Sequence, residues 1–178
     1  DFLKQVPASD RSVDGKLIEA LWELDAREYQ YVAIDLLVKC AQYGAEDAIE
    51  LYEKLVLSKS WWDTVDLLAR VVGIHFIKYP HLIQPKVSAY LDSGEMWLQR
   101  IALLFQLHYK TQTNWPLLEH CILSCIESRE FFIQKAIGWA LRQYSKVNPD
   151  QVAFFIEKHP LAPLSRREGM KYIAQTGF

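Results

Sequence analysis

Trp62-Asp63-Thr64-Val65 is one of four related segments that decide the fold of this chain. The others are Glu28-Tyr29-Gln30-Tyr31, Trp97-Leu98-Gln99-Arg100 and Phe132-Ile133-Gln134-Lys135, and successive segments begin 34, 35 and 35 residues apart. This spacing fits two helices of about 14 residues with short turns, the unit of an α-solenoid of stacked hairpins. The Trp-x-x-Leu-Gly signature of tetratricopeptide repeats is absent, so the period of about 35 residues predicts HEAT-like repeats.

The spacing of the apolar residues predicts an all-α fold. Of the 178 residues, 51% are hydrophobic, seven are Gly and seven are Pro, and apolar side chains recur every three or four positions. This periodicity is typical of amphipathic helices rather than strands. We predict helices over 13–24, 28–43, 46–57, 61–78, 83–91, 95–109, 116–126, 131–146, 149–158 and 165–174.

Composition excludes several other classes of protein. Charged residues make up 24% of the chain, which is ordinary for a globular domain and excludes a disordered or collagen-like one. No apolar run approaches the roughly 18 residues of a membrane span, and the first residues lack the basic and apolar regions of a signal peptide. We therefore expect a cytoplasmic protein.

The three cysteines indicate a reducing compartment. Cys40, Cys121 and Cys125 form an odd count without close spacing, so we expect free, mostly buried thiols. His120 stands beside Cys121, but no fourth ligand accompanies this group. The sequence therefore predicts no metal site, and it implies no cofactor.

Charge is distributed unevenly along the chain. Residues 1–92 carry ten Lys or Arg and fifteen Asp or Glu, whereas residues 93–178 carry ten and seven. The net charge of −2 therefore combines an acidic first half with a basic second half. Such an asymmetry can provide a local basic surface for nucleic acid, or it can have no partner at all.

The run Ser60-Trp61-Trp62-Asp63-Thr64-Val65-Asp66 contains more indoles and carboxylates than a core helix needs. Trp62 and Asp66 are four residues apart and share a helix face, where an indole beside a carboxylate suits a cation or a developing positive charge. Ser60 followed by Asp63 three residues later resembles an N-terminal capping box. We therefore assign Asp63 to the start of the helix and Asp66 to chemistry.

The repeat register predicts which side chains share a face, because equivalent positions of successive hairpins line up across a solenoid. Three sets of positions are equivalent in this register: Val65, Arg100 and Lys135; Asp66, Ile101 and Ala136; and Leu104 and Trp139. We therefore predict that Asp66, two bases and the indoles of Trp62 and Trp139 face a common side. An indole on a helix is more often a core residue, and we expect this of Trp22, Trp61, Trp97 and Trp115.

These residues resemble those of the AlkD-type DNA alkylation repair glycosylases. The likeness rests on segments 28–33, 60–66, 97–100 and 131–139, and it extends nearly from end to end. It implies a HEAT-like α-solenoid whose concave face holds duplex DNA. It also implies removal of bases alkylated at purine N3 or N7, such as 3-methyladenine and 7-methylguanine, by hydrolysis of the N-glycosidic bond. We expect one repeat domain over 1–178 that lacks the N-terminal helices of that family.

The resemblance also implies roles for individual residues. Asp66 matches the catalytic carboxylate, and Trp62 and Trp139 match two aromatic walls beside the lesion. Arg100 matches a contact to the DNA backbone. We expect six basic residues to bind phosphates with little sequence preference: Arg100, Lys135, Arg142, Lys146, Arg166 and Arg167.

The expected partner is double-stranded DNA that contains alkylated purines, bound by a monomer associated with the nucleoid and not with a membrane. Two alternatives stay open. One is a non-catalytic HEAT-like scaffold that binds branched or damaged DNA. The other is a solenoid that binds a peptide helix in its groove.

Overall fold

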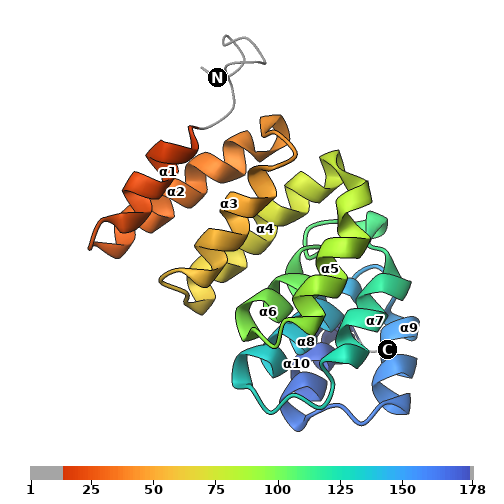
Figure 1. Cartoon of the computed structure of the whole chain (residues 1–178). Coiled ribbons are helices and arrows are strands. Elements are labelled where there is room, and N and C mark those ends of the chain that lie inside the picture. Colours follow the sequence, from red (N-terminus) through yellow and green to blue (C-terminus); the bar gives the residue numbers. More distant parts are fainter. Residues whose placement is uncertain (1–13, 177–178) are drawn as a thin grey trace. The chain divides into compact units, whose positions relative to one another are not determined.

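The computed structural model describes residues 14–176, which form ten α-helices and three short 3₁₀ helices, with no strand in that range (Figure 1). The α-helices are α1 (Gly15–Glu23), α2 (Arg27–Cys40), α3 (Ala48–Leu57), α4 (Trp62–Lys78), α5 (Ile83–Asp92), α6 (Met96–Leu104), α7 (Trp115–Ser124), α8 (Phe131–Tyr144), α9 (Pro149–Lys158) and α10 (Pro163–Thr176). The 3₁₀ helices are η3 (Ala41–Tyr43), η4 (Pro80–Leu82) and η5 (Lys110–Gln112). All ten predicted helices are confirmed, although Val13, the expected first residue of the first one, lies outside the described residues.

Alternate helices repeat with the predicted period. Helices α2, α4, α6 and α8 begin at Arg27, Trp62, Met96 and Phe131, so successive starts are 35, 34 and 35 residues apart. Neighbouring helices pack as hairpins, as α1 and α2 do in Figure 1. The all-α fold is therefore confirmed, and it is consistent with an α-solenoid of HEAT-like repeats.

The chain forms two compact units, an N-terminal unit that ends at Pro85 and a C-terminal unit that begins at Lys86. Large apolar side chains fill the core of the N-terminal unit, among them Ile18, Trp22, Ile34, Leu68 and Phe76. Those of the C-terminal unit include Ile101, Leu103, Ile122, Ile133 and Ile137. The single domain expected over 1–178 stays a prediction. Among the described residues, no helix has the length and apolar character that crossing a membrane requires.

Two helices, α2 and α6, end three or more residues earlier than predicted. The regular turns of α2 stop at Cys40, and the chain tightens into η3 before Gly44. Helix α6 stops at Leu104, five residues before the expected end. Just beyond it, the buried side chain of Gln106 accepts a hydrogen bond from the Asn114 amide (2.7 Å), so the chain folds back towards α7 instead of continuing the helix.

Three tryptophans that were expected to pack do so to different extents. Trp22 and Trp115 are buried as predicted, and Trp115 stacks on Tyr144 with ring centroids 4.8 Å apart. Trp97 is half-buried and packs against Phe132, with centroids 5.2 Å apart. Contacts of this kind stabilise aromatic pairs beyond the area that they bury.

The cysteines are free and buried, which confirms the prediction. Burial raises the pKa of Cys125 to about 11 and that of Cys121 to about 12. Thiolates at these positions are therefore scarce near neutral pH, and the thiols behave as small apolar side chains.

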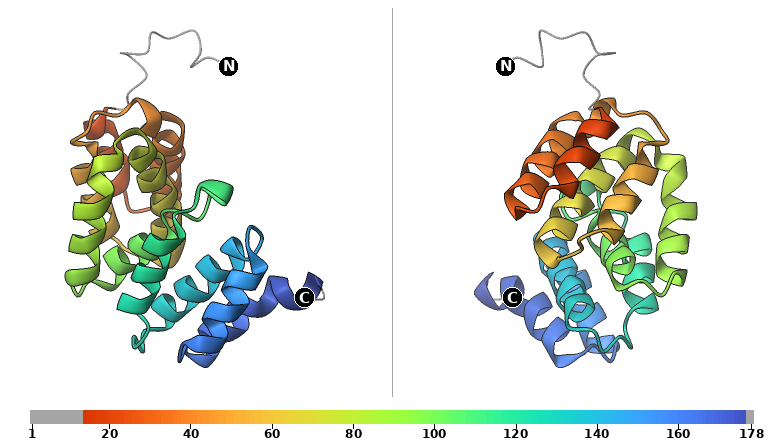
Figure 2. Two further views of the ribbon diagram at one scale, coloured as in Figure 1. Left: turned by 90° about the vertical axis from the view of Figure 1, so that its right-hand side faces the viewer. Right: turned by 60° about the vertical axis from the view of Figure 1, so that its left-hand side comes forward.

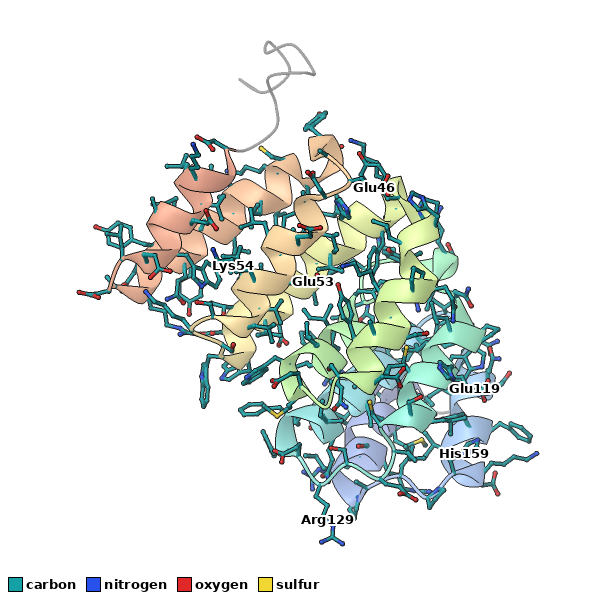
Figure 3. All side chains as sticks on the ribbon, in the orientation of Figure 1. Glu46, Glu53, Lys54, Glu119, Arg129 and His159 are labelled. Atoms are coloured by element: carbon teal, nitrogen blue, oxygen red, sulfur yellow. The ribbon has the colours of Figure 1, made fainter. Side chains whose placement is uncertain are left out.

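Polar side-chain contacts at the surface join separate segments of the N-terminal unit. Lys54 on α3, labelled in Figure 3, lies 2.6 Å from a carboxylate oxygen of Glu19 on α1. His81 Nε2 lies 2.8 Å from Glu46, which Figure 3 also labels. Both pairs are exposed to solvent, so each contributes little to the free energy of unfolding.

His75 is a buried imidazole of the N-terminal unit. Its Nε2 lies 3.1 Å from the Glu46 carbonyl oxygen, which fixes the proton on Nε2. Its buried Nδ1 has no hydrogen-bond partner among the described residues. Burial, the largest influence, lowers the pKa of His75, so the folded state resists protonation.

We expect the free energy of unfolding to be highest above the unfolded-state pKa of His75, 6.5, and to fall as the pH decreases below it. Below this pH the unfolded chain binds a proton at His75, whereas the buried imidazole of the folded chain stays neutral. Urea unfolding at a series of pH values between 8 and 5 measures the effect. His75→Gln should remove the decline in this window, whereas His81→Gln, at an exposed imidazole, should retain it. A decline that is unchanged in His75→Gln would assign it to another group.

Gly138 lets α8 and α10 approach closely within the C-terminal unit, whose last helices are blue in Figure 2. A Cβ atom at this position would lie 2.5 Å from Cβ of Glu168 and 2.9 Å from the carbonyl oxygen of Ser165, both on α10. The Ser165 hydroxyl in turn donates to the Gln134 carbonyl on α8 (2.8 Å). The two helices therefore meet backbone to backbone, which only glycine permits here.

Candidate functional site

The first turns of α4 present an indole and a carboxylate together. Trp62 opens the helix and is 47% exposed. Asp66 follows four residues later and is half-buried. Because residues four apart lie one above the other on a helix, Trp62 and Asp66 share a face of α4. The local pairing that the sequence predicts is thus present.

The start of α4 differs from the predicted capping box. The N-cap residue is Trp61, whose backbone is extended and whose side chain makes no capping hydrogen bond. The Ser60 hydroxyl instead donates to the carbonyl of Val56, one turn earlier in α3 (2.6 Å). Trp61 is 48% exposed, so its expected place in the core is wrong. It stands outside the helix and therefore does not follow the apolar face of α4.

Asp63 belongs to a cluster that joins α4 to α2. Arg27 donates to both carboxylate oxygens of Asp63, the Tyr31 hydroxyl donates to Oδ2 (2.6 Å), and the Thr64 amide donates to Oδ1 (2.7 Å). Burial alone raises the pKa of Asp63, but these hydrogen bonds outweigh it and hold the pKa below its usual value. Asp63 is therefore a structural residue, although its main partner is Arg27 and not Ser60.

The Arg27–Asp63 pair should contribute a modest coupling energy. The two side chains are 36% and 23% exposed, so solvent weakens their attraction. The bidentate geometry, in which Arg27 donates to both carboxylate oxygens, strengthens it. A double-mutant cycle with Arg27→Met and Asp63→Asn is expected to give a coupling of about 0.5–1 kcal/mol in urea unfolding. Strictly additive effects of the two substitutions would contradict this pairing.

Arg100 on α6 is buried, with 4% of the residue exposed. Its Nη1 donates a hydrogen bond to the carbonyl oxygen of Phe132 on α8, and its guanidinium lies 6.0 Å from the centroid of the Phe132 ring. The guanidinium is thus held in a fixed position by α8.

Lys135, Trp139, Arg142 and Lys146 follow one another along α8 and past its end. All but Lys146 are half-buried, and Lys146 is exposed. Lys135 and Arg142 form ion pairs with a residue that the sequence did not single out, Glu168 on α10 (3.1 and 3.3 Å). No local sequence pattern identifies Glu168 as a partner of these cations, because it lies 33 positions after Lys135.

Arg166 and Arg167 are both exposed near the start of α10. Arg166 Nη1 donates to the carbonyl oxygen of Ile156 at the end of α9 (2.9 Å), which gives it a structural task. Arg167 projects from the next position. Their contacts with DNA stay a prediction.

Unusual residues occupy repeat positions that are otherwise part of the core. Val65, Ile101, Leu104 and Ala136 are all buried. In other repeats the equivalent positions hold Asp66, Arg100, Lys135 and Trp139. Packing alone does not require an acid, two bases and an indole at such positions, because each polar group buried there needs a compensating partner.

The predicted site residues fall into two groups. Trp62 and Asp66 lie together in the N-terminal unit, whereas Arg100, Lys135 and Trp139 belong to the C-terminal unit. The common site that joins the two groups stays a prediction.

The fold and these residues define a helical-repeat protein of the HEAT-like class. Residues 1–173 match the family described as DNA alkylation repair enzyme, and the chain belongs to that family. It is also similar to a solved structure, a predicted DNA alkylation repair enzyme from Enterococcus faecalis. The two share 37% sequence identity with a TM-score of 0.85, over 98% of this chain and 82% of that one. No curated protein sequence matches the chain.

Membership in this family gives the protein a role in the repair of alkylated DNA, with DNA as its partner. The predicted resemblance and the predicted fold class are thereby confirmed.

Proposed function

We propose that the protein is a monofunctional DNA glycosylase that hydrolyses the N-glycosidic bond of purines alkylated at N3 or N7, including 3-methyladenine and 7-methylguanine. The observation that carries this proposal is the half-buried carboxylate of Asp66 one turn from the exposed indole of Trp62. Family membership supports alkylated DNA as the substrate. Release of the base begins base excision repair.

The chemistry of these lesions matches a site that offers one carboxylate. An N3- or N7-alkylated purine already carries a positive charge, so it departs as a neutral base and needs little help from a general acid. The N-glycosidic bond breaks with its electron pair going to the base, and the sugar develops oxocarbenium character. Asp66 stabilises that positive charge and orients the water whose oxygen attacks the sugar carbon.

The water must lose one proton as it adds to the sugar. The Asp66 carboxylate accepts this proton and passes it to solvent, so the charges balance: the base leaves neutral, and the hydroxylated sugar stays in the DNA strand as an abasic site. We assign to Trp62 and to Trp139 cation–π stabilisation of this developing charge, about 0.5–2 kcal/mol each. No metal or other cofactor is needed for these steps.

The basic residues bind the DNA backbone around the lesion. We assign this role to the six cations Arg100, Lys135, Arg142, Lys146, Arg166 and Arg167. Phosphate contacts provide affinity that depends on salt and little on sequence. The protein then acts as a monomer on duplex DNA at the nucleoid, in the cytoplasm.

Incubation with methylated duplex DNA tests the proposal directly. Free 7-methylguanine and 3-methyladenine should appear in the soluble fraction, quantified by chromatography with mass detection. Tight binding of DNA without release would favour a non-catalytic scaffold. Absence of both binding and release would favour a solenoid that binds a peptide.

A further inference from the structure

One buried carboxylate holds three cations in the C-terminal unit. Glu168 on α10 has a side chain that is only 7% exposed. Its Oε1 accepts hydrogen bonds from Lys171 (2.7 Å) and Lys135 (3.1 Å), and its Oε2 accepts one from Arg142 (3.3 Å). The contact with Lys171 contributes most to holding the pKa of Glu168 below its usual value, against the effect of burial. One negative charge thus faces three positive ones, and the cluster retains a net positive charge.

A cavity of about 260 Å³ adjoins this cluster. Its lining comes from α8, the residues just after it and α10: Trp139, Arg142, Gln143, Lys146, Lys171, Tyr172 and Gln175. Three of these seven residues are cations and none is an acid. A space of this volume is large enough for a phosphate group. A cavity of this charge selects an anion.

The cations have hydrogen-bond donors to spare. A lysine ammonium carries three N–H donors and a guanidinium carries five. Lys171 and Arg142 each give one to Glu168, and Lys146 gives one to the Gln143 side chain (2.9 Å). The remaining donors can bind the oxygens of a second anion while the contacts with Glu168 persist. Glu168 therefore holds Arg142 and Lys171 in place without neutralising them.

We propose that this cavity binds one phosphodiester group of the DNA backbone. Lys171, which the sequence did not indicate as a DNA contact, binds the phosphate together with Arg142 and Lys146. Glu168 is a positioning residue that orients these cations. The half-buried indole of Trp139 borders the same cavity, so the sugar attached to the phosphate lies against it. This inference rests on the proposed function, because it takes DNA bound for base release as the ligand.

Lys171→Met tests the contact on unmodified duplex DNA, so that no base release is needed. We expect affinity at low salt to fall about tenfold and the slope of log affinity against log salt to become shallower by about 0.9. Lys158→Met is the matched control, because Lys158 on α9 lies in the same unit and outside this cavity. An unchanged slope for Lys171→Met, or an equal loss for Lys158→Met, would overturn the proposal.

A series of duplexes locates the phosphate. Each duplex carries a neutral methylphosphonate linkage at one position, and the wild-type protein should lose affinity where that linkage enters the cavity. Lys171→Met should become insensitive to the substitution at that position and stay sensitive elsewhere. If the variant keeps every sensitivity of the wild type, Lys171 does not contact the backbone.

Glu168→Gln separates positioning from simple charge. Removal of a negative charge beside a phosphate should tighten DNA binding if charge alone matters, whereas loss of orientation should weaken it several-fold. We expect weaker binding, with a higher half-saturating protein concentration and an unchanged rate of base release at saturation. Glu168→Asp keeps the charge but shortens the reach, and it should weaken binding as well.

Both Glu168 variants are compared with the wild type at a temperature well below their unfolding midpoints. Tighter binding by Glu168→Gln, or wild-type binding by Glu168→Asp, would remove the positioning role. If no base is released at all, the proposed function fails, and the phosphate site is still judged by Lys171→Met on unmodified DNA.

Discussion

Replacement of Asp66 with asparagine is expected to slow the release of 7-methylguanine from methylated duplex DNA about a thousandfold. Asparagine keeps nearly the same shape and removes the charge. A carboxylate about 4 Å from a unit positive charge, at an effective dielectric constant near 20, is worth roughly 4 kcal/mol. The half-buried position of Asp66 keeps solvent from screening this attraction fully. Single-turnover release, with protein in excess over lesions, measures the rate of the chemical step.

Asp63→Asn is the matched control for this experiment. Asp63 lies in the same first turns of α4, but its carboxylate is held by Arg27 and Tyr31. The control should lower the free energy of unfolding modestly and leave the rate of base release close to that of the wild type. Binding of unmodified DNA should persist in Asp66→Asn, because the role proposed for the carboxylate lies in the transition state and not in phosphate contacts. Equal release by the wild type and Asp66→Asn would remove the assigned role of Asp66.

Gly138→Ala is expected to lower the free energy of unfolding by about 1–3 kcal/mol, although alanine is the better helix former. The added Cβ would lie within 3 Å of two atoms fixed to the backbone of α10, Cβ of Glu168 and the carbonyl oxygen of Ser165. Neither can rotate away, so α10 must move from α8. Urea unfolding followed by circular dichroism measures the change.

Gly169→Ala provides the comparison for the glycine in α8. Gly169 is also buried, but a Cβ there would first meet Cδ1 of Ile156 at 3.0 Å and Cβ of Leu141 at 3.2 Å. Side-chain atoms such as Cδ1 can shift, and the gain in helix propensity offsets part of the strain. We expect a smaller loss than for Gly138→Ala. A larger loss at Gly169 would show that the backbone contact at Gly138 is not the limiting one.

Displacement of α10 should also change DNA binding. Glu168 and Lys171 both lie on α10, whereas Arg142 and Trp139 lie on α8. Gly138→Ala should therefore weaken binding of DNA even at temperatures where the variant is folded. The close approach of α8 and α10 at Gly138 is therefore a structural requirement of the proposed phosphate site.

Much of the fold was predictable because it depends on local sequence. The 3.6-residue periodicity identified ten helices, and the related segments gave a period that the starts of α2, α4, α6 and α8 reproduce. The pairing of Trp62 with Asp66 was also predictable, because helix geometry alone places residues four apart on one face. Composition and spacing likewise predicted the buried, free cysteines.

The predictions for the start of α4 were wrong, because the side chains there bind partners other than those that the local pattern suggests. The pattern of Ser60 and Asp63 fits a capping box, yet Asp63 finds Arg27, 36 residues earlier, and Ser60 turns back to Val56. A charge-assisted hydrogen bond to Arg27 on a neighbouring helix is stronger than a capping hydrogen bond. The local spacing of residues around Asp63 does not indicate this partner. Trp61 is exposed for a related reason. Helix α4 begins at Trp62, so Trp61 is the N-cap residue and does not follow the apolar face of the helix.

The sequence by itself determined the class of fold, the repeat period and the placement of Trp62 and Asp66 on one face of α4, because each depends on spacing within one or two helical turns or on a regular repeat. Only the tertiary structure decided that Arg100 is buried against the Phe132 carbonyl. It alone revealed Glu168, whose contacts with Lys135 and Arg142 span 33 and 26 residues of sequence. Contacts of that range depend on how closely α8 and α10 pack, and that distance is set by Gly138 together with the backbone that faces it.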